Sequence, residues 1–243
     1  MHLLVTRPEP DAAELKTRLE ALGHRVSLAP LLSVETVLDE PVDLKGARGL
    51  VVTSRNSLKV LEGTPQLAGA FELPVFAVGP GCGSLARAMG FVTVLEGPAA
   101  ARDLVALVEA HARPVEGPLL HLTGERRAFD LKGALEARGF EVREKIVYRT
   151  VPAAALPESV AQDVAEAAID AVLLMSPRTA EVFVELIAAA GLVAEARRLV
   201  YMCLSQGVAE PLRRLGPIHI EMARRPNLDE LIEAVILLTA RSA

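Results

Sequence analysis

Short runs rich in Val and Leu alternate with amphipathic helical stretches along nearly the whole chain. The runs predict strands near residues 3–6, 25–29, 49–53, 75–78, 92–95, 118–122, 141–147, 171–175, 199–203 and 218–221. Helices are predicted near 9–22, 55–62, 80–89, 101–111, 126–138, 177–189, 205–214 and 226–240. Repeated β-α alternation indicates an α/β fold, with parallel sheets covered by helices on both faces. This number of strands is larger than is usual for one open sheet, so we expect two sheets and two domains.

The chain also repeats itself in the order A-B-A′-B′. Segment A, residues 1–30, resembles segment A′, residues 117–146. Segment B begins at Gly49 and segment B′ at Ala171, so that Ser54 falls on Ser176. The matched positions in A and A′ are Leu15 with Leu131, Leu19 with Leu135, Gly23 with Gly139 and Val26 with Val142. Each domain is therefore expected to contain one A-type and one B-type segment.

Two stretches between these segments, 31–49 and 147–160, carry prolines and β-branched residues. Proline disfavours helix and suits extended connectors. Two extended crossings would let the chain leave one domain and later return, so that A pairs with B′ and B with A′. The alternative is two sequential domains, A-B and A′-B′. Periodicity alone does not choose between them.

Composition excludes several classes of function. A net charge of -5, with no Lys/Arg run interleaved with aromatics, argues against a nucleic-acid binder. The apolar runs are too short to span a bilayer. The first ten residues contain charges and two prolines, unlike a signal peptide, and the 2 cysteines are far apart, so we expect a cytoplasmic protein with reduced thiols. The histidines, His2, His24, His111, His121 and His219, show no pair at metal-ligand spacing, so no metal site is predicted.

The turns from strand to helix are the candidate binding elements. In an open parallel sheet, ligands bind beyond the carboxyl ends of the strands, where helix N-termini attract carboxylate or phosphate. The turns in question are Arg7-Pro8, Ser54-Arg55-Asn56, Gly79-Pro80-Gly81, Thr123-Gly124, Ser176-Pro177 and Ser205-Gln206. Serine at such a position is usually only a helix cap, and Pro177 suits the first helical position. Six such turns together are a stronger signal of an anion site than any one of them.

Three further features bear on the chemistry. Neither Ser turn matches G-x-S-x-G, and the stretch from Val78 to Gly83 is not a dinucleotide or Walker motif. Cys82 and Cys203 are predicted to be small buried fillers. Tyr201 lies in an apolar strand and is predicted to be core, whereas Tyr148 either anchors the crossing or presents its hydroxyl to a ligand.

An ordered set of motifs resembles the uroporphyrinogen-III synthase family. The motifs are "LVTRPEP", "VVTSRNS", "FAVGPG", "LARAMGF", "IVYRTVP", "LLMSPRTAEVF" and "PNLDELIEAV", and together they cover nearly the whole chain. The resemblance implies two flavodoxin-like α/β domains with parallel sheets, joined by a two-stranded linker. One domain, 1–32 plus 155–243, is discontinuous; 37–147 form the inserted domain, and 33–36 with 148–154 form the linker.

The resemblance also implies a reaction that needs no cofactor. The family closes hydroxymethylbilane, a linear tetrapyrrole with eight carboxylates, to uroporphyrinogen III, inverting ring D through a spiro intermediate and losing water. Such chemistry is mostly orientation, and an acid for the departing hydroxyl helps. Tyr148 matches the family's tyrosine and is the candidate acid or orienting donor. The implied substrate contacts are Arg7, Thr53, Ser54, Asn56, Gly79, Thr123, Gly124, Ser176, Pro177 and Ser205.

Two rival functions remain open on the sequence. A non-catalytic two-lobed binding protein for an anionic metabolite would use the same turns. A glycosyltransferase with two α/β lobes normally has a denser set of phosphate-binding Gly and basic residues than this chain shows. In either reading two lobes enclose a ligand without a partner chain, so a monomer is expected.

Overall fold

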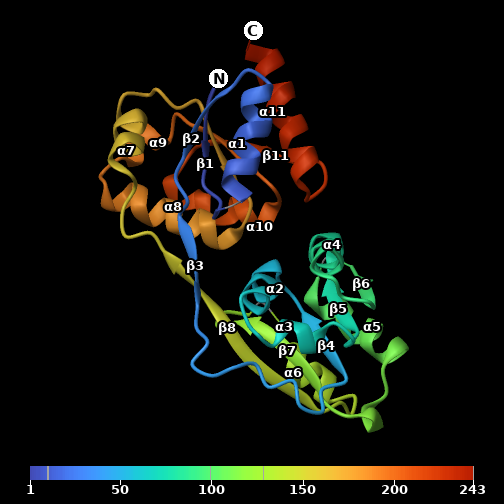
Figure 1. Ribbon diagram of the computed structural model, residues 1–243. Coiled ribbons are helices and arrows are strands. Elements are labelled where there is room, and N and C mark those ends of the chain that lie inside the picture. The colour runs from blue at the N-terminus through green and yellow to red at the C-terminus, as the bar shows by residue number, and fades with distance from the viewer. Residues whose placement is uncertain (10, 99, 128, 243) are drawn as a thin grey trace. The chain divides into compact units, whose positions relative to one another are not determined.

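The computed structural model describes residues 1–9, 11–98, 100–127 and 129–242 (Figure 1). It divides into two compact units. The terminal unit consists of Met1–Ser33 and Val151–Ala243, and the inserted unit consists of Val34–Thr150. Among the described residues, no helix has the length and apolar character needed to cross a membrane.

The terminal unit is built on a five-stranded parallel sheet with the order β11-β10-β9-β1-β2. The strands are β1 (His2–Val5), β2 (Arg25–Leu28), β9 (Ala171–Leu174), β10 (Val200–Cys203) and β11 (His219–Met222). Successive side chains of a strand point to opposite faces, so Leu4 packs into one buried cluster and Leu3 and Val5 into another. Both faces of this sheet are therefore covered.

Helices from distant parts of the sequence cover these two faces (Figure 1). One face packs against α1 (Asp11–Ala21) and α11 (Leu228–Ser242). The other face packs against α7 (Glu158–Ala165), α8 (Pro177–Ala189), α9 (Val193–Ala196), α10 (Gln206–Ala209) and the 3-10 helix η3 (Glu210–Leu215). Because α1 and α11 share one cluster, the two ends of the chain are held in the same unit.

The inserted unit has a six-stranded sheet with the order β3-β8-β7-β4-β5-β6. The strands are β3 (Leu32–Thr36), β4 (Gly49–Val52), β5 (Val75–Val78), β6 (Val94–Gly97), β7 (Leu119–Gly124) and β8 (Val142–Pro152). All neighbours are parallel except the edge strand β3, which runs against β8: Val37 N–H donates to Val147, and Ala153 N–H donates to Leu31. The expected linker segments, 33–36 and 148–154, fall on β3 and on the end of β8 with the two residues after it.

Two groups of helices cover the sheet of the inserted unit. One face packs against α2 (Arg55–Glu62), α3 (Leu67–Ala70) and α4 (Gly79–Met89). The other packs against α5 (Leu104–His111) and α6 (Leu131–Glu136), with the 3-10 helices η1 (Ala101–Asp103) and η2 (Pro114–Glu116) in the adjoining loops. This layering confirms the predicted parallel α/β class.

The internal repeat is visible in the topology. Read from the A-type strands, the terminal unit has the order β2-β1-β9-β10-β11 and the inserted unit β8-β7-β4-β5-β6, which is the same 2-1-3-4-5 winding of flavodoxin-like sheets. The turn after the helix of each A-type segment is also shared, since Gly23 after α1 and Gly139 after α6 have φ values of 85° and 86°. A side chain is strained in that region, so glycine is required at both matched turns.

Three predicted elements were wrong in extent. The helix predicted at 126–138 is confined to Leu131–Glu136, because the Asp130 side chain accepts from Gly133 N–H at 3.0 Å and starts the helix there. The stretch expected to be extended up to residue 160 already forms α7 from Glu158, directly after Pro157. The helix predicted at 205–214 is a short α10 followed by η3, where Pro211 provides no backbone N–H.

We predict that Tyr201→Phe lowers the free energy of unfolding. The Tyr201 ring is fully buried, packs edge-on against Phe183, and donates its hydroxyl to the Ala196 carbonyl at 2.9 Å. Removing the hydroxyl leaves that buried carbonyl without its donor, which costs about 1–2 kcal/mol. Urea denaturation followed by circular dichroism measures the change. Tyr148→Phe, which alters a partly exposed tyrosine, is the matched control, and equal stability of the two variants would contradict the assignment.

Candidate functional site

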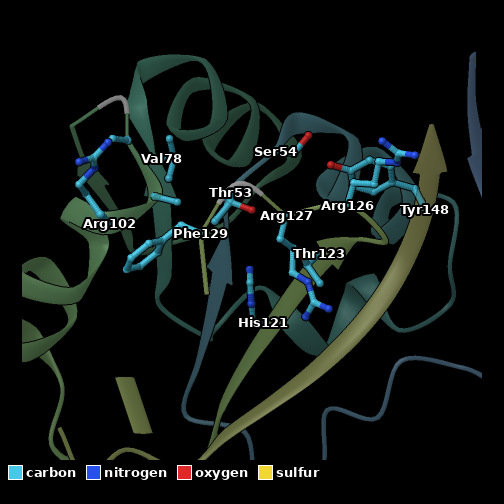
Figure 2. Close-up of a pocket in the computed structure, with 12 residues that line it drawn as sticks. Thr53, Ser54, Val78, Arg102, His121, Thr123, Arg126, Arg127, Phe129 and Tyr148 are labelled. Carbon is cyan, nitrogen blue, oxygen red and sulfur yellow. The ribbon is translucent and has the colours of Figure 1, made fainter. Parts of the chain in front are cut away.

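A cavity of about 430 Å³ opens at the carboxyl edge of the sheet in the inserted unit (Figure 2). Its lining residues are Thr53, Ser54, Val78, Ala100, Ala101, Arg102, His121, Thr123, Arg126, Arg127, Phe129 and Tyr148. Thr53 and Ser54 follow β4, Val78 ends β5, the residues from Ala100 to Arg102 follow β6, and the others belong to β7, to the loop after it or to β8. The cavity lies where the winding of the sheet reverses between β4 and β7. Ligands bind at that reversal in open α/β sheets.

The turn from β4 to α2 contributes two hydroxyl residues, Thr53 and Ser54. Ser54 has extended backbone (φ -149°, ψ 142°), and its Oγ accepts from the Asn56 N–H at 3.2 Å. The predicted helix cap is therefore confirmed. Asn56 sits in the first turn of α2 with its N–H used in this cap, whereas Ser54 both caps the helix and lines the cavity.

Tyr148 reaches the cavity because β8 contains an irregularity. Thr123 pairs with Ile146, but the next residue, Gly124, pairs with Tyr148, so Val147 is an extra residue on β8. Both Val147 and Tyr148 consequently pack against the same buried cluster, although neighbours on a regular strand face opposite sides. The bulge thus turns the tyrosine ring, and Figure 2 shows its hydroxyl directed toward the side of the cavity where Ser54 lies.

Gly124 makes room for that ring. A Cβ atom at this position would lie 2.6 Å from Cζ and 2.9 Å from the hydroxyl oxygen of Tyr148, closer than van der Waals contact allows. The tyrosine therefore lies directly against the backbone at the end of β7. The structure gives Gly124 a packing role beside its predicted role as a ligand contact.

Three arginines surround the cavity. Arg102 comes from η1, and Arg126 and Arg127 from the loop that follows β7. Arg127 forms an ion pair with Glu144, while Arg102 and Arg126 are exposed and have no ion-pair partner in the described ranges. An arginine fork matches the two oxygens of a carboxylate, so the site is locally cationic on a chain of net charge -5.

The floor of the cavity holds a buried histidine (Figure 2). His121 Nδ1 lies 3.1 Å from Oε1 of Glu144, its register partner on β8. Burial lowers the pKa of His121 below its usual value, which outweighs the charge and hydrogen bond of Glu144 that raise it, and the Arg127 charge lowers it further. The ring is therefore neutral at pH 7, with Nδ1–H donating to the carboxylate.

The remaining predicted contacts are placed as follows. Gly79 begins α4 directly after the cavity residue Val78. The other four lie in the terminal unit: Arg7, Ser176, Pro177 and Ser205. There, Arg7 pairs with Asp11 at 2.5 Å. Ser176 caps α8 by accepting from Thr179 N–H at 3.0 Å, and Pro177 is its first residue, both as predicted. Ser205 precedes α10 without a side-chain cap.

Among the lining residues that sequence reasoning missed are His121, Arg102 and Phe129, and it placed Arg126 and Arg127 on a helix. One signal was available for the histidine: in "LLHLTG", His121 and the predicted contact Thr123 are two apart and so share a face of β7. Arg102 and Phe129 had no such signal, because neither lies on a strand whose alternation would assign its side chain to a face.

Metal and thiol chemistry find no support in the described part of the chain. Within the residues placed by the structure, no group of three or more His, Cys, Asp or Glu is arranged to hold a metal ion. Cys82 and Cys203 are free and buried, as predicted. Burial raises the pKa of Cys82 to about 11 and that of Cys203 to about 12, so both thiols stay protonated.

Comparison with known proteins gives one consistent family. A family model described as uroporphyrinogen-III synthase HemD matches residues 13–233. A uroporphyrinogen-III synthetase structure from Helicobacter pylori is similar with TM-score 0.66 and 16% identity, over 98% of this chain and 100% of that one. A mutant uroporphyrinogen III synthase from the extremely thermophilic bacterium Thermus thermophilus is similar with TM-score 0.57 and 18% identity, over 99% of both chains. None of the curated proteins matches the chain. At these identities the structures establish the shared fold.

We predict that His121 stays neutral where a solvated histidine is half-protonated, near pH ~6.5. The reason is its burial, which disfavours the charged ring and lowers its pKa. Nitrogen-detected NMR of histidine-labelled protein, recorded between about pH 5 and 8, the range in which histidines titrate, measures the protonation and shows the Nδ1–H tautomer. Half-protonation of His121 at or above the usual value of about 6.5 would contradict the geometry described above.

Proposed function

Because this chain belongs to the uroporphyrinogen-III synthase HemD family, we propose that it closes hydroxymethylbilane to uroporphyrinogen III, inverting ring D and releasing water. The observation that carries the proposal is the family match, which spans residues 13–233 of 243. The enzyme is a cyclising lyase of tetrapyrrole synthesis. Its task is orientation, since the reaction requires one particular ring carbon to attack.

The cavity of the inserted unit suits a substrate with many carboxylates. Arg102 and Arg126 have no ion-pair partner among the described residues, and Thr53, Ser54 and Thr123 supply hydroxyl groups at the same cavity. A hydrogen bond to a charged group contributes about 1.5–3 kcal/mol, so a few such contacts are enough for micromolar binding. The positive charge that a polyanionic ligand requires comes from arginines at the cavity, so a protein with a negative net charge can still bind it.

Tyr148 is the proposed acid for the departing hydroxyl. Its ring is held between Gly124 and the buried cluster of α2 and α4, so the phenol is fixed in direction before the ligand arrives. A positioned donor contributes to the rate without a cost of reorganisation. The proton goes to the hydroxyl of the substrate, which leaves as water while the exocyclic carbon becomes the electrophile.

The working state is proposed to be a cytoplasmic monomer. The support is that the hydroxyl residues, the arginines and Tyr148 gather at one cavity within the inserted unit. Size-exclusion chromatography with light scattering measures the mass, and 25.9 kDa is the expected value.

The first experiment generates hydroxymethylbilane in situ, adds the protein, oxidises the products and separates the uroporphyrin isomers by chromatography. Uninverted isomer I forms without an enzyme, so a predominance of isomer III is the expected result. If a folded sample yields only isomer I, the synthase proposal is refuted, and a non-catalytic protein that binds an anionic metabolite remains as the alternative function.

We predict that Tyr148→Phe lowers kcat for isomer III by about 10²-fold, the lower end of the usual contribution of a general acid. KM changes little, because the ring and its packing stay. Tyr201→Phe, which removes a hydroxyl from the core of the terminal unit, is the activity control. Unchanged turnover of Tyr148→Phe would remove the hydroxyl from the mechanism.

We predict that Gly124→Ala lowers isomer III formation about as much as Tyr148→Phe, because the new Cβ displaces the tyrosine ring. Gly69→Ala is the matched control, since a Cβ there meets only the Leu44 side chain, at 3.6 Å. Steady-state kinetics of both variants and a crystal structure of Gly124→Ala test this. Full activity with an unmoved ring would contradict the prediction.

A further inference from the structure

The pair His121 and Glu144 is a polar pair in an otherwise apolar position of the sheet. His121 is 1% exposed, and its Nδ1 is satisfied by Glu144. Its Nε2 is buried and has no hydrogen-bond partner in the part of the chain that the structure describes. An unpartnered buried polar atom costs free energy, and one beside a cavity can regain that cost by binding a ligand. This atom belongs to a side chain that lines the cavity.

The duplicated unit shows that the fold does not require this pair. The repeat matches Val26 to Val142, and hence Leu28 to Glu144. In the terminal unit Leu28 is the register partner of Val5, as Glu144 is of His121 in the inserted unit. Val5 is fully buried and packs in the core. The same cross-strand site is thus apolar in one unit and His-Glu in the other.

The tautomer determines what Nε2 can bind. With Nδ1–H donating to the carboxylate of Glu144, the neutral ring presents a lone pair at Nε2. A lone pair accepts a hydrogen bond and repels a carboxylate oxygen. The floor of the cavity therefore selects an N–H or O–H group, while the arginines meet carboxylates. In a tetrapyrrole, the donors that repeat along the chain are the pyrrole N–H groups.

We propose that Nε2 of His121 is a catalytic base that accepts the proton of a pyrrole N–H while the new carbon–carbon bond forms. The inference rests on the proposed function and deepens it. Attack by a pyrrole carbon makes the ring nitrogen cationic, so the N–H becomes a much stronger donor in the transition state than in the bound substrate. An interaction that strengthens in this way accelerates the reaction.

The proton balance closes without a cofactor. Tyr148 protonates the hydroxyl, which leaves as water while the nitrogen electron pair of the same pyrrole stabilises the exocyclic carbon, and the ring D carbon then bonds to that carbon. The N–H proton passes to Nε2, giving an imidazolium ion beside the Glu144 carboxylate and a neutral spiro intermediate. The imidazolium returns this proton as the old carbon–carbon bond breaks, and the ring carbon that closes the macrocycle loses its proton to the phenolate. One water is released and both side chains are restored.

The double variant His121→Val with Glu144→Leu tests the proposal, because it installs the apolar pair that the terminal unit already uses. Replacement of a buried polar pair by apolar groups is often neutral or stabilising, and the Arg127–Glu144 ion pair that is also lost lies near the surface, where such pairs contribute little. Urea unfolding is therefore expected to stay close to that of the wild type. We expect kcat for isomer III to fall about 10- to 100-fold, with KM within about twofold. His24→Gln, a change at a buried histidine of the terminal unit, is the control and should leave kcat unchanged. A folded double variant with wild-type kcat overturns the proposal.

The pH dependence of kcat/KM distinguishes a catalytic base from a residue that only supports the structure. The wild-type kcat/KM should stay flat from about pH 7.5 down through the usual histidine value of about 6.5 and fall only at more acid pH, because burial lowers the pKa of His121 and a protonated Nε2 has no lone pair. The charged and titratable groups around His121 are Glu144 and Tyr148 of β8, Arg126 and Arg127 after β7, and Arg102 after β6; β4 presents Val51 as its register partner. Ordinary phenol and guanidinium groups titrate at much higher pH, and comparison with His121→Gln separates the acid limb of His121 from that of carboxyl groups.

His121→Gln tests the proposal if the double variant fails to fold. Glutamine offers an acceptor but no titration, so kcat should fall about tenfold and the acid limb should disappear. An unchanged kcat and acid limb overturn the proposal. A wild-type protein that yields only isomer I refutes the proposed function itself, and the base role falls with it. If the wild type yields isomer III and the His121 variants have the same kcat as the wild type, only the base role of His121 is refuted.

Discussion

The parallel hydrogen-bonded pairing of β4 with β7 is the contact on which the candidate site depends. It joins Gly49 to Leu119 and continues to Val52 and Leu122, so segments far apart in the chain end at one edge. Beyond that edge, the turn after β4 with Thr53 and Ser54 and the loop after β7 with Arg126 and Arg127 line the same cavity. Residues at the ends of these two strands come together at one binding site only when the strands pair. The equivalent ladder in the terminal unit joins Leu3 to Ala171 and holds the two ends of the chain together.

Duplication gives this chain an internal reference for function. Both units use the same strand order, the same left-handed glycine after the first helix and the same Ser cap after the B-type strand. What the units share is explained by folding, since each must cover both faces of a parallel sheet. What they do not share, such as the bulge before Tyr148 and the buried His121, needs another cause. The contrast separates architecture from chemistry within one molecule.

Local backbone devices aim the groups at the cavity. An extra residue in β8 rotates Tyr148, Gly124 accepts its ring, and the Asp130 cap shortens α6 so that Arg126 and Arg127 lie in a loop. Each device is small, but together they determine which atoms point inward. A shift of one residue in β8 would turn the tyrosine to the opposite face of the sheet. Orientation of this kind is what a reaction with little side-chain chemistry requires.

The sequence by itself determined the α/β class, the repeat and the serine caps, because these depend on short-range periodicity and on residues within one turn of each other. It also indicated Thr53, Ser54 and Thr123, which lie at strand-to-helix turns, and Tyr148, which matches the family's tyrosine. The tertiary structure alone decided that they line one cavity, that Arg102 and Phe129 join them, and that His121 is buried with an Nε2 to which no described residue is hydrogen-bonded. Those facts depend on strand order, a bulge and loop paths, which arise from contacts between residues distant in sequence and leave no local periodic signal.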